Sequence, residues 1–205
     1  MKELFKLSPE VGSDVVVVDN FYKNPDAIRE FALRLPLVDN NTDSAGGYKG
    51  LRSKENFRYS DIRIKIQESI GEIIHEDSWN SHRFNGCFQI TSAENSQVYH
   101  CDQNSWAGVL YLTPDAPVQS GTRTHISKST GLRSLVGATM EQQTETFEKG
   151  FYDSTKFDIV DSIGNIYNRL VLFRSHNIHS AGPYFGLNMW DGRLVQLFFF
   201  DTLKG

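Results

Sequence analysis

The 205-residue sequence has few cysteines, no long apolar run and no excess of positive charge. Its two cysteines, Cys87 and Cys101, are too few for the disulfide framework of a small secreted fold, so we expect reduced thiols in the cytosol. No stretch approaches the roughly 18 apolar residues of a membrane helix, and the N-terminus lacks the apolar region of a signal peptide. We therefore predict a cytoplasmic protein without a membrane span.

The charge balance narrows the class of partner. The net charge is -4 and the pI is about 5.9, which argues against duplex nucleic acid, because binding to it depends on a basic surface. Charged residues make up 22% and hydrophobic residues 39%, the balance of a globular protein, and the length suits a single domain over residues 1–205. The 14 phenylalanines favour a large sheet content.

The first 80 residues are expected to form a largely helical support. A β-branched run at Asp14–Asp19 predicts one buried strand. Asn24–Asp26 has the cap, first-turn proline and first-turn acid of a helix start, and Pro36 ends that helix. A second helix opens at Ser60, and its apolar stripe consists of Ile62, Ile66, Ile70 and Ile73. Leu37–Phe57 is expected to be a loop, long enough to be functional or mobile.

After about residue 80, apolar residues alternate with others, as they do in strands. The strand candidates are Phe84–Ile90, Trp106–Leu112, Phe157–Ile163, Asn168–Arg174 and Arg193–Phe200. A further helix is expected around Glu141–Lys149. We predict a mainly β fold (α+β), with a double-stranded β-helix core of the jelly-roll or cupin type over residues 81–205 and the N-terminal helices packed on it. A β-sandwich of another topology is the structural alternative.

His100-Cys101-Asp102 is the first motif that points to chemistry. On a strand, residues two apart project from the same face, so His100 and Asp102 would direct an imidazole and a carboxylate at one point. A second histidine from a distant strand would complete the two-histidine, one-carboxylate set that holds non-haem Fe(II) with three positions open. For an isolated H-x-D motif, a His–Asp hydrogen bond on a strand is the simpler explanation.

The C-terminal part offers both a second histidine and a cation. His176 and His179 follow the strand candidate Asn168–Arg174, and each competes to be the distal ligand. Arg193 opens the apolar stretch Arg193–Phe200, where a buried charge needs a partner. An arginine exposed at a strand end is the simple interpretation. The functional interpretation is a planar fork that binds a carboxylate through two hydrogen bonds, such as the far carboxylate of 2-oxoglutarate.

This order of H-x-D, a distant histidine and an arginine on the following strand resembles the Fe(II)/2-oxoglutarate-dependent oxygenase superfamily. Gly121–His125, which follows Tyr111–Thr113, is similar to the "YL…GG.T" stretch of its prolyl-hydroxylase-like branch. Val18–Pro25 is similar to the start of small phage or bacterial members. The resemblance spans most of the chain, and its specificity comes from order and spacing. A phage-encoded member would act in the host cytoplasm.

The resemblance implies roles for four residues. His100, Asp102 and His179 match the iron ligands, and Arg193 matches the cosubstrate arginine. His179 is preferred to His176 because it precedes Ser-Ala-Gly, the small-residue setting that follows the distal histidine in this family. His176 is then a loop residue or a partner that supports a ligand.

Three further positions bear on the same resemblance. Val195 stands where some relatives have a serine, and Ser120-Gly121 stands where a double glycine is familiar. Both departures concern contacts with the cosubstrate. Halogenating relatives lack the carboxylate of the H-x-D motif, so the presence of Asp102 favours hydroxylation.

Residues near the motifs are candidates for other contacts. Tyr111 and Gln89 lie on strand candidates from which they could hydrogen-bond the cosubstrate, although core packing explains Tyr111 equally well. Asn104 and Trp106, just after the H-x-D motif, are candidates for the substrate wall.

Gly121–Gly131 is expected to be a loop that carries Arg123 and His125, with Lys128 and Arg133 nearby. One interpretation is a solvated basic loop. The other is a rim that faces the substrate over the iron, with Arg123 and His125 as contacts.

The resemblance thus predicts a 2-oxoglutarate-dependent dioxygenase (hydroxylase) that uses Fe(II), 2-oxoglutarate and O2 and releases succinate and CO2. The sequence leaves open whether the substrate is a small molecule or a peptidyl group. One alternative is a non-catalytic cupin-like protein that binds a metal or ligand, which would have no need of Arg193. Another is a cupin-type metal-dependent isomerase or hydrolase, which would act without O2.

Overall fold

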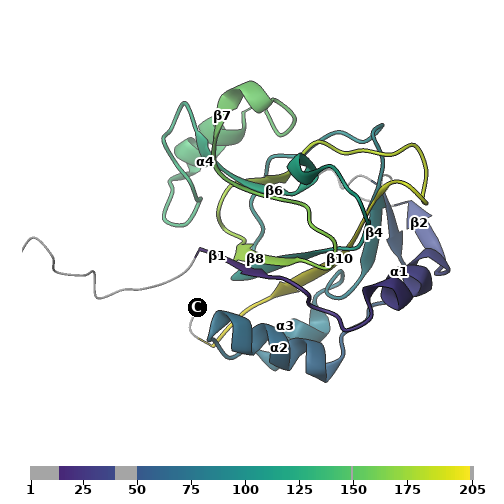
Figure 1. Cartoon of the computed structure of the whole chain (residues 1–205). Coiled ribbons are helices and arrows are strands. Elements are labelled where there is room, and N and C mark those ends of the chain that lie inside the picture. The colour runs from purple at the N-terminus through teal and green to yellow at the C-terminus, as the bar shows by residue number, and fades with distance from the viewer. Residues whose placement is uncertain (1–13, 40–49, 149, 204–205) are drawn as a thin grey trace, which may run out of the picture.

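The computed structural model describes residues 14–39, 50–148 and 150–203, and two antiparallel sheets face one another in it (Figure 1). The large sheet has seven strands in the order β1-β8-β5-β10-β4-β3-β2, and the small sheet has three in the order β7-β6-β9. The strands of the large sheet are β1 (Val15–Val18), β2 (Leu37–Asp39), β3 (Leu51–Ser53), β4 (Phe88–Thr91), β5 (Trp106–Tyr111), β8 (Leu170–Arg174) and β10 (Arg193–Phe200). Those of the small sheet are β6 (Thr122–Ser127), β7 (Phe157–Ile163) and β9 (His179–Ala181).

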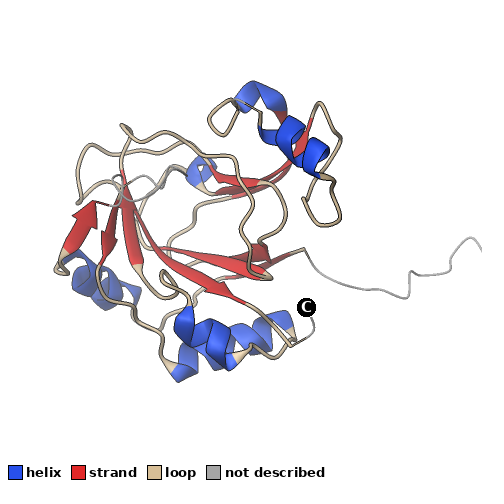
Figure 2. Ribbon diagram, turned by 180° about the vertical axis from the view of Figure 1, so that it is seen from behind, coloured by secondary structure: helices blue, strands red, loops and turns tan. Residues whose placement is uncertain are grey.

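The helices lie outside the two sheets (Figure 2). They are α1 (Pro25–Leu33), α2 (Ser60–Ile70), α3 (Glu76–Ser81) and α4 (Met140–Phe147). The first three pack on the outer face of the large sheet, and α4 lies beside the small sheet. α1 begins as predicted, since the Asn24 side chain accepts a hydrogen bond from the Ala27 amide. α4 confirms the helix expected near residue 141, whereas α3 was not predicted. No helix in the described ranges is long and apolar enough to cross a bilayer.

Strand β10 lies in the middle of the large sheet and is buried on both faces. Leu194, Phe198 and Phe200 pack beneath the helices, whereas Val195 and Leu197 face the space between the two sheets. Burial on both faces explains why this part of the sequence is a continuous apolar run rather than an alternating one. The mainly β fold with two facing sheets agrees with the predicted jelly roll.

The stretch Leu37–Phe57, expected to be a loop, contributes two strands. β2 and β3 pair with each other, and β3 also pairs with β4. Gly50 permits this approach, because its φ is +92° and a Cβ there would lie 2.2 Å from the Ile90 carbonyl oxygen. Residues 40–49 of the expected loop lie outside the described residues. With β1, β2 and β3 in the large sheet, the β-core also draws on the chain before residue 80.

The stretch Gly121–Gly131, also expected to be a loop, contains the central strand of the small sheet. β6 pairs with β7 on one side and with β9 on the other, with an irregularity between Thr124 and His125. Its sequence lacks the apolar alternation by which strands are identified. The strand is held instead by pairing and by polar contacts, such as the hydrogen bond of Thr124 to the Asp161 carboxylate.

Helix α2 allows a matched test of the core between the helices and the large sheet. Ile66 is fully buried there, whereas Ile64 on the same helix is 49% exposed. We expect Ile66→Ala to lower the free energy of unfolding by about 2–5 kcal/mol, because it leaves a cavity. Ile64→Ala is expected to change it by about 0.5 kcal/mol or less. Urea unfolding of the two variants measures both values, and equal losses would contradict the packing described here.

Candidate metal centre

The backbone brings His100 and His179 directly opposite each other. The amide of His100 donates to the carbonyl of His179 at 3.1 Å, and the amide of His179 donates to the carbonyl of His100 at 2.8 Å. This bridge is isolated, so the H-x-D motif lies in an extended segment and not, as predicted, within a strand. Asp102 is fixed next to it by a hydrogen bond from its amide to the Ser175 carbonyl at 2.9 Å.

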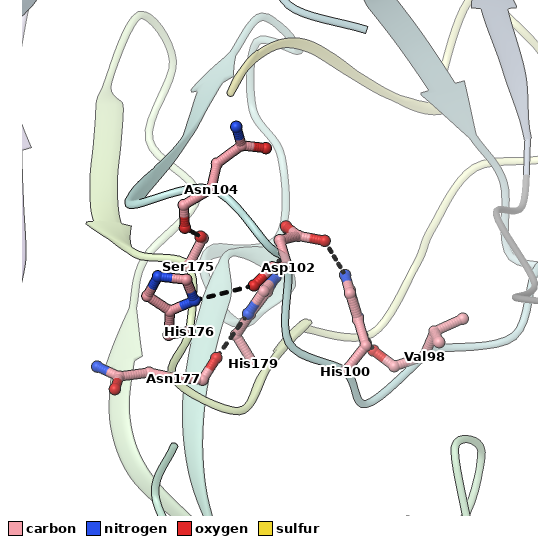
Figure 3. Close-up of polar contacts among 8 residues, drawn as sticks. All are labelled: Val98, His100, Asp102, Asn104, Ser175, His176, Asn177 and His179. Atoms are coloured by element: carbon pink, nitrogen blue, oxygen red, sulfur yellow. Dashed lines mark hydrogen bonds and ion pairs between the residues drawn. The ribbon is translucent and has the colours of Figure 1, made fainter. Parts of the chain in front are cut away.

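The three predicted ligands meet at one point (Figure 3). Nε2 of His100 lies 3.6 Å from Oδ1 of Asp102, and Nε2 of His179 lies 3.4 Å from its Oδ2. One ligand atom from each residue lies within 4.8 Å of the other two, and the group is able to hold a metal ion. His179 is buried, while His100 and Asp102 are partly exposed.

Backbone carbonyls orient both imidazole rings. Nδ1 of His100 lies 3.2 Å from the Val98 carbonyl oxygen, and Nδ1 of His179 lies 2.8 Å from that of Asn177 (Figure 3). A carbonyl oxygen only accepts, so each Nδ1 carries a proton and a neutral ring keeps its lone pair on Nε2. Two nitrogen lone pairs and a carboxylate then converge, and they need a cation between them, either a ring proton or a metal ion. The support of ligand rings through Nδ1 is a usual feature of metal sites.

The charges of the three groups suit a metal ion at neutral pH. Burial and the nearby His179 lower the pKa of His100 to about 4, so this ring is neutral. Burial opposes ionisation of Asp102, but the hydrogen bond with His179 holds its pKa at about 2. Two nitrogens and one carboxylate form the donor set that suits non-haem iron.

His176 lies outside this group. Its Nδ1 is 3.2 Å from the backbone carbonyl oxygen of Asp102 (Figure 3), and it is not part of the group of converging ligand atoms. The placement therefore agrees with the choice of His179 over His176 as the distal histidine, and it gives His176 a contact to the backbone of a proposed ligand.

A cavity of about 290 Å³ opens from the three residues into the space between the sheets. Arg193 lines it and is only 3% exposed, so it is not the exposed strand-end residue of the simple interpretation. Its Nε donates to the Ser120 carbonyl at 3.0 Å. Its guanidinium carbon lies 5.4 Å from the ring centroid of Tyr111 and 5.9 Å from that of Tyr184.

The two residues predicted to contact the cosubstrate differ in position. Gln89 lines the cavity. Tyr111 is fully buried just behind the wall, where its hydroxyl shares a hydrogen bond with Thr122 at 2.7 Å. Thr122 and Arg193 line the cavity, whereas Tyr111 does not. Tyr111 therefore acts on the cavity only through its contacts with these two residues.

Asn104 and Trp106, expected in the substrate wall, do not line this cavity. Trp106 is fully buried under the helices, and its indole donates to Glu72 at 3.1 Å. Asn104 donates to the Asp201 carboxylate at 3.3 Å. Ala107 on β5 does line the cavity, and the neighbouring Trp106 points to the opposite face of the strand.

Arg123 and His125 do not form a solvated loop or a rim over the metal centre. Both lie on β6, and neither lines the cavity. His125 is buried, its Nε2 lies 2.9 Å from the Ser180 hydroxyl, and burial lowers its pKa to about 4. It is therefore an uncharged support behind Ser180, which does line the cavity.

Sequence reasoning missed Arg52. This arginine lies on β3, is 3% exposed and lines the cavity, and its Nε donates to Oε1 of Gln89 at 2.6 Å. The residues around it predicted a loop, where arginines are common, so nothing in the local sequence indicated a buried position.

Both cysteines are free thiols. Burial raises the pKa of Cys87 to about 11 and that of Cys101 to about 12, so both are protonated at neutral pH. Cys101 lies between two of the proposed ligands and contributes to the cavity wall.

Comparison with known families adds a family assignment. A family of unknown function (DUF6445) matches residues 6–183 of the sequence. The chain belongs to this family. No curated protein matches this DUF6445 member.

Solved structures resemble the DUF6445 chain in fold. HygX from Streptomyces hygroscopicus, with nickel, 2-oxoglutarate and hygromycin B bound, has a TM-score of 0.53 at 10% identity over 94% of this chain and 84% of its own. SnoK, a non-haem α-ketoglutarate-dependent carbocyclase from nogalamycin biosynthesis, has a TM-score of 0.50 at 12% identity over 92% and 79%. A prolyl-4-hydroxylase from Pseudomonas putida has a TM-score of 0.49 at 12% identity over 92% of each chain. At these identities the likeness to HygX and SnoK shows a shared fold alone, in agreement with the predicted double-stranded β-helix.

Proposed function

We propose that this DUF6445 member is an Fe(II)- and 2-oxoglutarate-dependent dioxygenase that hydroxylates a substrate held in the cavity between the sheets. One observation carries the proposal. His100, Asp102 and His179 converge at a cavity that also holds the buried cation of Arg193. Three candidate metal ligands and a carboxylate-binding arginine in one cavity suit a cosubstrate that has a carboxylate at each end.

In this proposal His100, Asp102 and His179 hold Fe(II), and Arg193 binds the far carboxylate of 2-oxoglutarate. When bound, iron and 2-oxoglutarate supply the oxidation by O2 that yields succinate, CO2 and a hydroxylated substrate. The chain orients these groups. The Val98 and Asn177 carbonyls fix the two rings, and the Ser120 carbonyl fixes the Arg193 guanidinium. Tyr111, whose hydroxyl is bonded to Thr122, lies beside Arg193 as a second support for the cosubstrate.

The walls between these groups are partly apolar. Alongside the polar residues the cavity is lined by Val109, Phe173, Leu197 and Phe199. In such surroundings a charge-assisted hydrogen bond to Arg193 is stronger than in water. The solved structures support the proposal at the level of fold, since HygX binds nickel and 2-oxoglutarate and SnoK depends on α-ketoglutarate. The substrate is proposed to be a small molecule or a peptidyl group.

Succinate release tests the proposed function. The purified protein supplied with Fe(II), ascorbate and 2-oxoglutarate in air is expected to form succinate slowly without substrate, and Zn(II) is expected to stop this turnover. Asp102→Ala, which removes the carboxylate of the donor set, should reduce succinate to the level without protein. Metal binding without 2-oxoglutarate binding would instead indicate a non-catalytic binding protein. Turnover of a ligand without O2, in the presence of Zn(II) or Mn(II), would indicate a cupin-type isomerase or hydrolase.

A further inference from the structure

The proposed function leaves one buried charge of the cavity without a role, that of Arg52. Its Nε donates to Gln89, and its guanidinium carbon lies 4.2 Å from the centroid of the Phe84 ring. Both Arg52 and Gln89 line the cavity and are buried, at 3% and 7% exposure. A guanidinium stacked on a ring and bonded at Nε is held in one orientation.

The sheet register separates Arg52 from Arg193. Arg52 on β3 lies opposite Gln89 on β4, which lies opposite Val195 on β10. Arg193 is two residues from Val195 and shares its face. Two strand spacings across and two residues along place the Cα atoms of the two arginines roughly 12 Å apart. The backbones of the two arginines are therefore anchored at different places along the large sheet.

The backbone around Arg52 is built for this position. Gly50 precedes β3 with a φ of +92°, and any side chain there would collide with the backbone of β4 at Ile90. The glycine thus lets β3 approach β4 closely enough for the Arg52 side chain to meet Gln89 across the strand pair.

The donors on this wall define a ligand chemistry. The Gln89 oxygen is directed at Arg52, which makes its amide nitrogen a donor beside the guanidinium. Arg52 and Gln89 bring N–H groups and the charge of one guanidinium to the cavity wall, and apolar side chains such as Leu197 and Phe199 line the same cavity. A single charge matches a carboxylate better than a phosphate dianion.

We infer that Arg52 and Gln89 bind a carboxylate of the substrate, while Arg193 binds 2-oxoglutarate. This inference rests on the proposed function. The substrate class is then a carboxylic acid with an apolar body, either a small molecule or a peptide with an accessible carboxylate. The substrate carboxylate would anchor at β3 and β4 and leave the apolar part to extend along the wall towards the metal centre.

The test uses isobutyrate as a minimal probe, because it joins one carboxylate to a small apolar body. Saturation-transfer NMR is recorded on the full chain loaded with Zn(II), which does not turn over, and saturated with 2-oxoglutarate so that the Arg193 position is filled. We expect isobutyrate to bind and uncharged isobutyramide not to bind. The binding of inorganic phosphate is observed through its phosphorus resonance. We expect phosphate to bind at least tenfold more weakly than isobutyrate.

Two variants and one control locate the site. Arg52→Gln removes the charge and should raise the isobutyrate Kd at least roughly tenfold, the loss of one charge-assisted hydrogen bond. Gln89→Glu keeps the size of the side chain, so the fold should be kept. It also supplies an internal carboxylate for Arg52, so the Kd for isobutyrate should rise by a similar factor. Arg83→Gln is the matched control, because exposed Arg83 lies 5.0 Å from the same Phe84 ring but does not line the cavity. It should leave the Kd unchanged.

The outcomes separate this inference from the proposed function. If 2-oxoglutarate itself fails to bind, the proposed function is overturned first. If 2-oxoglutarate binds to the wild type but isobutyrate does not, only the role of Arg52 is overturned. The same holds if isobutyrate binds equally to wild type and both variants, if phosphate binds more tightly, or if Arg52→Gln weakens 2-oxoglutarate more than Arg193→Gln does.

Discussion

Replacing His179 with alanine is expected to lower Fe(II) affinity by more than about 100-fold and to abolish 2-oxoglutarate decarboxylation. The variant removes one of two nitrogen donors from a group whose ligand atoms lie within 4.8 Å of one another. Loss of a residue that only supports a ligand costs about 10- to 100-fold in metal affinity, so loss of the ligand itself should exceed that range. Isothermal titration with Fe(II) under anaerobic conditions measures the affinity, and succinate formation measures the turnover.

His176→Ala is the matched control for this prediction. It removes an imidazole only three residues away, whose ring contacts the backbone carbonyl of Asp102 and not the converging ligand atoms. We expect it to reduce Fe(II) affinity by about tenfold at most, the lower end of the supporting range, and to keep most of the turnover. Equal losses in the two variants would contradict the assignment of His179 as the distal ligand.

Replacing Arg193 with glutamine is expected to raise the Kd for 2-oxoglutarate roughly 30-fold to several thousand-fold. Removing one member of a buried, hydrogen-bonded charge pair costs about 2–5 kcal/mol, and each 1.4 kcal/mol is about tenfold in affinity. Arg193 is buried, lines the cavity and is oriented by the Ser120 carbonyl. Fe(II) affinity in the absence of 2-oxoglutarate should stay close to wild type, because Arg193 takes no part in the metal centre.

Titration of 2-oxoglutarate into Fe(II)-loaded protein under anaerobic conditions gives the affinities. Arg193→Lys, which keeps the charge but not the planar fork, should fall between wild type and Arg193→Gln. Arg63→Gln is the control, since Arg63 pairs with Glu76 on the outer helices, away from the cavity. If Arg193→Gln binds 2-oxoglutarate like the wild type, the proposed role of Arg193 is wrong.

The three candidate metal ligands and the buried guanidinium of Arg193 border the same cavity. A protein that merely binds a metal needs the three ligands but no buried cation in the same cavity. Here the cavity contains both, and the walls between them are largely apolar. The His179 and Arg193 variants are therefore expected to fail in different ways, the first at metal binding and the second at cosubstrate binding. Loss of metal binding in one variant and of 2-oxoglutarate binding in the other would distinguish the dioxygenase from the non-catalytic alternative.

Local sequence determined the features that depend on neighbouring residues. The apolar runs that became β1, β8 and β10, the Asn24 cap of α1 and the stripe that buries Ile66 were predicted, because each follows from short-range periodicity or capping. The burial expected of β1 was wrong, because it is an edge strand whose Val17 is 44% exposed. The spacing of His100 and Asp102 and the distal position of His179 also indicated residues that the fold brings together. For these three residues the order of the motifs along the chain was enough to predict that they come together.

Tertiary structure alone decided which faces and strands border the cavity. Trp106 is near the H-x-D motif in sequence but points under the helices, and His125 lies on a polar strand that pairing holds in place. Arg52 became a cavity residue because β3 pairs with β4. The alternation of side chains between the two faces of a strand follows from the local sequence. Which of the two faces becomes interior depends on pairing between residues far apart in the chain. No pattern within a short stretch of sequence carries that information.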